Sequence, residues 1–159
     1  MRNIFKRALA VLASTAMCGS MLLYYPSGTF EAFQLDLRAQ AAEGIAISEE
    51  NFPDDMFRSY VNGYINRNAD GVLTLDEILN VKEMCVENMG IADLTGVEYF
   101  TELTHLFCYG NTLTTLDVSA NTALEYLNCT DNALTSIDVS ANTALTKLYC
   151  EGNPLASES

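Results

Sequence analysis

A 21-residue period dominates the second half of the sequence. From Thr101 the chain reads TELTHLFCYGNTLTTLDVSAN, then TALEYLNCTDNALTSIDVSAN, then TALTKLYCEGNPLAS. The first two blocks share 12 of 21 residues, and all three carry the pattern L-x-x-L-x-C-x-x-N-x-L. A fixed period of this length indicates one supersecondary unit that recurs and buries its apolar face against its neighbours. The sequence therefore predicts a solenoid.

The repeat also predicts which side chains each strand exposes. Side chains alternate between the two faces of a strand, so Leu106 and Cys108 should point into the core while their neighbours point outward. Parallel strands lie about 4.8 Å apart, so equivalent outward residues should line up across the units. We expect a candidate ligand-binding face made of two columns with one residue at their edge, namely His105, Tyr126 and Lys147, then Phe107, Asn128 and Tyr149, and finally Tyr109.

This pattern is the leucine-rich-repeat template with cysteine in place of the third strand leucine. It resembles the short Cys- and DVS-containing repeats of bacterial cell-surface leucine-rich-repeat proteins, internalin-like in general form. The resemblance implies an α/β fold, a short solenoid of parallel strands over residues 81–159. About four units fit, of which the first (Val81 to Ile91) is imperfect and the last is incomplete.

Two further ladders follow from the period. Asparagines at 111, 132 and 153 occupy turn positions, where the side-chain amide bonds the local backbone. Cysteines at 108, 129 and 150 occupy inward positions. Parallel strands in register hold neighbouring Cβ atoms farther apart than the ~3.5–4.5 Å of a relaxed disulfide, so we expect three reduced, buried thiols.

Residues 66–77, NRNADGVLTLDE, form the one segment with explicit chemistry. They resemble the calcium loop of EF-hand and dockerin-type modules, which takes oxygen ligands at fixed places and glycine at the sixth. The resemblance implies a Ca²⁺ site at Asn66, Asn68, Asp70, Val72 (through its carbonyl), Thr74 and Glu77, with Gly71 at the turn. Because asparagine replaces the usual first aspartate, the affinity should be weak, about 10⁻⁴–10⁻³ M. The alternative is a polar turn that joins two helices.

Residues 45–80 surround this loop and are predicted to form a small helical, EF-hand-like cap on the repeats. Pro53 in a first turn, beside Asp54 and Asp55, predicts a helix start. An apolar stripe follows at helical spacing and is expected to enter the core: Met56, Phe57, Tyr60, Val61 and Tyr64. Thr74 should cap an exit helix from Leu75 to about Asn80.

Residues 1–41 are predicted to be an export leader. A basic start (Arg2, Lys6, Arg7) precedes 23 uncharged residues and a small-residue site at 39–41. The uncharged run is also long enough to span a bilayer, so an uncleaved amino-terminal anchor remains an alternative. Either interpretation places the domain at the cell surface or outside the cell.

Charge and residue types limit the classes of function that this chain can have. From Ala42 onward there are 19 acidic and four basic residues, a surface that repels nucleic-acid phosphates. His105 and Cys108 should lie on opposite faces of one strand, so no Cys–His pair forms and we expect no enzyme.

The sequence favours an exported, calcium-stabilised module that presents its strand face to a protein or glycan partner. Membrane contact would involve only an uncleaved amino-terminal segment. The alternative is a calcium-stabilised spacer, or a truncated fragment of a larger surface protein, with no ligand of its own.

Overall fold

The computed structural model describes residues 44–156. The predicted leader, residues 1–41, lies outside this range. Among the described residues, no helix has the length and apolar character needed to cross a membrane.

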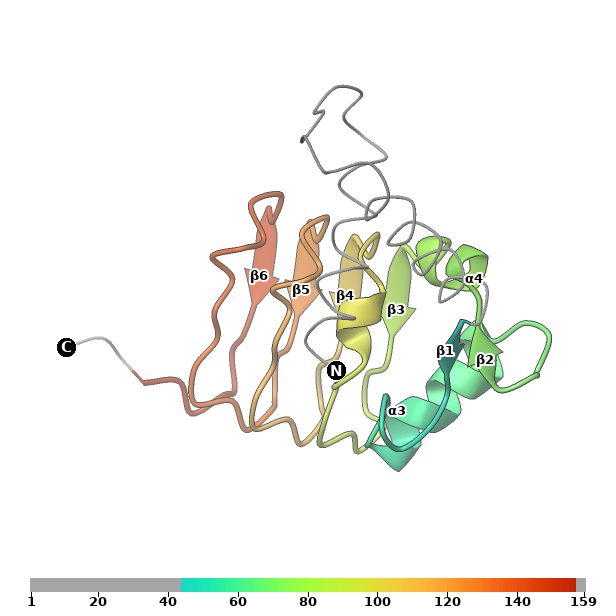
Figure 1. Ribbon diagram of the computed structural model, residues 1–159. Helices are drawn as coiled ribbons and strands as arrows, with labels where there is room; N and C mark the ends of the chain where they lie inside the picture. Colours follow the sequence, from blue (N-terminus) through green and yellow to red (C-terminus); the bar gives the residue numbers. More distant parts are fainter. Residues whose placement is uncertain (1–43, 157–159) are drawn as a thin grey trace, which may run out of the picture.

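Four short parallel strands stand side by side in chain order and form the spine of the molecule (Figure 1). They are β3 (Glu83–Cys85), β4 (His105–Phe107), β5 (Tyr126–Asn128) and β6 (Lys147–Tyr149). Each strand pairs in parallel with the next, and the return segments are irregular apart from a 3₁₀ turn at Val97–Tyr99. The predicted parallel-strand solenoid is therefore confirmed.

Inward-pointing strand residues form a continuous core. Leu106, Leu127, Cys108 and Cys129 are fully buried, as the alternation predicts. The prediction is wrong for the last unit, because Leu148 is 38% exposed and Cys150 is only partly buried. Both belong to the edge of the sheet, where a neighbouring strand covers them from one side only.

The predicted asparagine ladder forms and ties successive units together. The Asn132 amide nitrogen donates to the carbonyl oxygens of Cys108 (2.9 Å) and Cys129 (3.0 Å), and its Oδ1 accepts the Leu113 N–H at 3.1 Å. Asn111 and Asn153 repeat the arrangement. Each side chain thus satisfies backbone groups of two units, which buried turns require.

A second asparagine ladder was missed in the sequence. Asn121 donates to the carbonyls of Val97 and Phe100, both at 2.9 Å, and Asn142 repeats this one unit later. Both side chains are buried. The sequence does carry a signal for this ladder, because Asn121 and Asn142 are each the last residue of a repeated DVSAN segment.

The segment before β3 forms a cap at the β3 end of the sheet (Figure 1). Its elements are β1 (Ile45–Ala46), α3 (Asp55–Tyr60), a π-helical turn (Val61–Ile65), β2 (Val72–Leu73) and α4 (Leu75–Leu79). Asp54 is the N-cap of α3 and its carboxylate accepts the Met56 and Phe57 N–H groups. Pro53 precedes this cap rather than lying in the first turn, which corrects the predicted start by about two residues.

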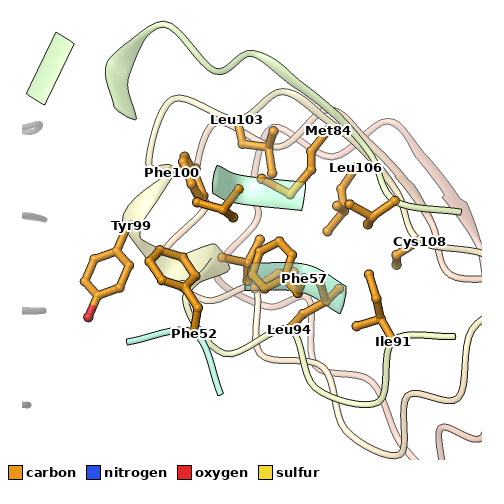
Figure 2. Close-up of a cluster of buried hydrophobic side chains, with 14 of the residues drawn as sticks. Phe52, Phe57, Met84, Ile91, Leu94, Tyr99, Phe100, Leu103, Leu106 and Cys108 are labelled. Carbon is orange, nitrogen blue, oxygen red and sulfur yellow. The ribbon is translucent and has the colours of Figure 1, made fainter. Parts of the chain in front are cut away.

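Aromatic and aliphatic side chains join the cap to the first repeats (Figure 2). Phe57 is fully buried, and its ring centroid lies 5.8 Å from that of Phe52, which in turn lies 5.7 Å from that of Tyr99. The stripe predicted to enter the core therefore divides. Phe57 and Val61 are buried, whereas Met56 is 47% and Tyr64 76% exposed. Met56 lies one position, about 100° around the helix, from Phe57, so it points off the buried face. Tyr64 lies in the π-helical turn, whose wider period moves it off the face that Val61 occupies.

The cysteine column leads to a test by alkylation. Burial raises the pKa of the Cys129 thiol to about 11 and moves that of Cys108 further in the same direction. Because the thiolate is the reactive form, both should resist iodoacetamide in native protein at pH 8 and react fully after denaturation. Mass spectrometry of native and denatured samples measures this. Rapid native labelling of Cys129 would show that the strand register is wrong.

Candidate functional site

The strand pairing places the predicted face residues in two columns. Residue pairs across the sheet align His105 with Tyr126 and Lys147, and Phe107 with Asn128 and Tyr149. Tyr109 follows two residues after Phe107, beyond the end of β4. Whether this face binds a ligand stays a prediction, because the pairing fixes position and not affinity.

The rings on this face touch one another across strands. The Tyr126 ring lies 5.8 Å from His105 at an interplanar angle of 14°, 5.0 Å from Phe107 and 5.4 Å from Tyr149, measured between centroids. Lys147 Nζ lies 5.7 Å from the centre of the Tyr126 ring, within cation–π range. The four rings, His105, Phe107, Tyr126 and Tyr149, make one strip, which we call the aromatic strip.

The Tyr126 hydroxyl is a hydrogen-bond donor of the aromatic strip at neutral pH. Desolvation first, and then the neighbouring Tyr149 phenol, raise the pKa of Tyr126, so its hydroxyl keeps its proton. His105 Nδ1 lies 3.0 Å from the Thr104 hydroxyl. A partner that lies on the aromatic strip would therefore meet flat apolar rings with hydroxyl groups at their ends.

The structure extends the outer face to β3, whose outward residues the repeat pattern did not predict. Pairing of β3 with β4 sets Glu83 beside His105 and Cys85 beside Phe107. The Tyr60 hydroxyl accepts the Cys85 N–H at 3.3 Å, and the Tyr64 ring stacks on Tyr60 at 5.1 Å. The sequence signal was weak, because the first repeat is imperfect and Tyr60 and Tyr64 share helical spacing with buried residues.

No Cys–His pair forms between His105 and Cys108. Cys108 is fully buried in the core, whereas His105 lies on the outer face of β4. The separation predicted from strand alternation is confirmed for these two residues.

A second candidate site is the loop at residues 66–77. Asn66 is 4% exposed, and its Oδ1 is buried without a hydrogen-bond partner among the described residues. Its amide nitrogen donates to Asn62 Oδ1 at 3.0 Å, which leaves the oxygen pointing elsewhere. Gly71 has φ +80°, a conformation that favours glycine at the sixth place of such a loop. An unpaired buried oxygen at the first ligand place fits a hard cation.

The rest of the loop supplies mostly neutral oxygens. Asn68 and Asp70 bond each other, with the Asn68 amide nitrogen 2.7 Å from Asp70 Oδ2. Nowhere in residues 44–156 do three His, Cys, Asp or Glu side chains gather as a metal cluster. Calcium accepts amide, hydroxyl and carbonyl oxygens as ligands, so a calcium site at this loop stays a prediction.

Glu77 holds the two ends of the loop together. Its carboxylate accepts the Arg67 N–H (2.8 Å) and the Thr74 N–H and hydroxyl (both 2.8 Å), and Thr74 caps α4 in return. Burial alone would raise the pKa of Glu77, but these hydrogen bonds outweigh it and lower the pKa. Glu77 is therefore a carboxylate at neutral pH, at the place where the loop requires one.

The strand of the loop has a partner within the cap. β1 pairs antiparallel with β2, Ile45 opposite Leu73, and the Ile47 N–H donates to the Gly71 carbonyl at 2.9 Å. In the structure, the β1 segment supplies hydrogen-bond partners for backbone groups of the loop that would otherwise be unpaired.

Comparisons with known proteins agree with this fold. No protein-family model matches the chain. Over 71 residues the chain is 42% identical to internalin J of Listeria monocytogenes serotype 4b (strain F2365), a match that covers 45% of this chain and 8% of that protein. The solved functional domain of InlJ from Listeria monocytogenes, which includes a cysteine ladder, has TM-score 0.66 and 36% identity, covering 76% of this chain and 27% of that one.

An internalin (inlF) from Listeria monocytogenes str. 4b F2365 has the same TM-score, 0.66, at 24% identity, covering 74% of this chain and 35% of that one. This second likeness shows the fold alone. The chain spans about a quarter of the solved InlJ domain and less than a tenth of internalin J. The repeat signature, the parallel sheet and these similarities make the described part of the chain an internalin-like leucine-rich-repeat solenoid.

Proposed function

We propose that this chain is an exported binding module whose strand face recognises a protein partner. The observation that supports this is the aromatic strip, four rings on the outer face of β4, β5 and β6 that are linked by contacts through Tyr126. Such rings bury large areas at little cost in side-chain entropy, which makes them frequent hot spots of interfaces. The similarity to internalin J also supports the proposal of a binding module.

A glycan partner and a spacer without any ligand are the competing functions. Rings can stack on sugar faces, and they can also do no more than cover their own strands. An array of purified extracellular proteins and glycans, probed with the intact chain, separates the three. We expect a protein hit that the Phe107→Ala/Tyr126→Ala/Tyr149→Ala variant loses.

The matched control changes three residues on the return turns instead, Thr115→Ala/Ser136→Ala/Ser140→Ala, which line a groove off the strands. It should bind like the parent chain. A partner that still binds the Phe107→Ala/Tyr126→Ala/Tyr149→Ala variant would refute the proposal. Hits confined to glycans would favour glycan binding instead.

We also propose that calcium binds the loop at residues 66–77 and stabilises the cap. The supporting observation is the buried, unpaired Asn66 Oδ1 at the first ligand place. Asn66, Asn68, Asp70, Thr74 and Glu77 would supply side-chain oxygens, and Val72 its carbonyl. The ion would offset the negative charge of the loop and so favour the folded cap.

We expect calcium to raise the melting temperature of the whole module. At ten times the dissociation constant the gain is about 1.4 kcal/mol, or about 5 °C for a domain of this size. Glu77→Gln should abolish the shift. Asn66→Asp should lower stability without the ion, because the bond to Asn62 is lost, and should bind calcium more tightly. An unchanged melting curve in millimolar calcium, with no heat in calorimetry, would leave the loop as a turn.

A further inference from the structure

We propose that the β3 end of the strand face takes a cationic side chain, arginine or lysine, of the protein partner. The groups that would hold it are Tyr60, Tyr64, Glu83 and Glu87, which we call the cation corner. The inference rests on the proposed binding function and specifies the chemistry of the partner at one place.

Two stacked tyrosines supply the rings of the cation corner. Tyr60 is anchored by its hydrogen bond to the Cys85 N–H, and Tyr64 stacks on it with 76% of its surface exposed. Packing within the cap does not require Tyr64, because Phe57 and Val61 fill the buried face of the same helix. An exposed ring stacked on an anchored one presents a fixed π-face, which attracts cations.

Two glutamates supply the carboxylates of the cation corner. Alternation along β3 sends Glu83, Cys85 and Glu87 to the outer face, on either side of buried Met84 and Val86. The Glu87 Oε2 atom is buried and has no hydrogen-bond partner within residues 44–156. Burial raises the pKa of Tyr60 and of Cys85, and the charge of Glu87 adds to both shifts, so this carboxylate lies close to both groups. A shielded, unpaired carboxylate oxygen gains most from a charged donor.

The charge pattern of the face favours a cation over a neutral group. Glu83 begins the column that continues through His105 and Tyr126 to Lys147, so the column is acidic at β3 and basic at β6. Three strand spacings of about 4.8 Å separate the two ends by ~14 Å. The complementary partner carries a basic residue over the cation corner and, ~14 Å away, an acceptor for Lys147. A neutral sugar would leave both ends unmatched.

A titration with a blocked tripeptide tests the cation corner without the natural partner. Amide resonances of the isotope-labelled full chain are followed while acetyl-Gly-Arg-Gly-amide is added, and again with citrulline in place of arginine. We expect saturable shifts at Tyr60, Tyr64 and Cys85 with arginine, and at least fivefold weaker binding with citrulline, which has the same shape without the charge. Glu87→Gln should weaken arginine binding at least fivefold.

The control Asp138→Asn removes a carboxylate from the groove on the return turns and should leave the arginine titration unchanged. Equal binding of arginine and citrulline, shifts that Glu87→Gln does not reduce, or shifts spread over all acidic surfaces would overturn the inference. These results leave the proposed function intact, since a partner on the array can still depend on Phe107, Tyr126 and Tyr149. Loss of that dependence, with localised arginine shifts, would instead refute the proposed function alone.

Discussion

Asn132→Ala is expected to destabilise the solenoid by about 2–6 kcal/mol. The change leaves the buried Leu113 N–H without its acceptor and removes bonds to the carbonyls of Cys108 and Cys129. An unsatisfied buried donor costs about 1–3 kcal/mol, and each lost bond about 0.5–1.5 kcal/mol. Urea unfolding followed by circular dichroism gives the difference in the free energy of unfolding.

Asn153→Ala is the matched control for this prediction. Asn153 makes the same set of bonds in the last unit, but they are only partly buried, so water replaces the lost partner. Its cost should be less than half that of Asn132→Ala. Equal costs for the two changes would mean that burial does not set the energy of the ladder.

Phe57→Ala is expected to cost about 3–5 kcal/mol, because it empties a fully buried site where the cap meets the repeats. Tyr64→Ala, two turns along the same helix and largely exposed, should change stability by about 0.5 kcal/mol or less. Thermal unfolding read at two probes, one in the cap and one on β5, measures both.

The same experiment tests how the cap is coupled to the repeats. Since Phe52 contacts both Phe57 and Tyr99, loss of Phe57 should lower a single transition shared by both probes. A cap transition that moves alone, while the β5 transition stays, would contradict one cooperative unit.

The repeats could be predicted from the sequence because their information is local and repeated. A period of 21 residues sets the register, strand alternation then sets the faces, and the position of Asn132 in each unit sets the ladder. The exposure of Leu148 and Cys150 could not be predicted in this way, because it depends on their place at the edge strand β6 rather than on the repeat.

The cap was harder to predict because its structure depends on contacts between distant segments. The pairing of Ile45 with Leu73 brings together two short strands that no local pattern joins. Likewise, spacing alone could not decide that Phe57 is buried while Tyr64 faces solvent. The unpaired oxygen of Asn66 is visible only once every neighbouring donor has been placed.

The imperfect first repeat hid part of the candidate face. Met89 stands where later units have asparagine, so the repeat pattern does not predict which residues the first unit turns outward, Glu83 and Glu87 among them. The three regular units, in contrast, allowed the columns through His105 and Phe107 to be derived from alternation and strand spacing alone.

Hydroxyl-radical footprinting of the chain with and without its array-identified protein partner tests the central claim most directly. The reagent oxidises exposed aromatic and aliphatic side chains, so it reports which of them a partner covers. We predict that oxidation of Phe107, Tyr126 and Tyr149 falls severalfold in the complex, while Leu116 on the return turns stays as reactive as in the free chain. Unchanged oxidation of the three rings together with protection of the return turns would contradict the account.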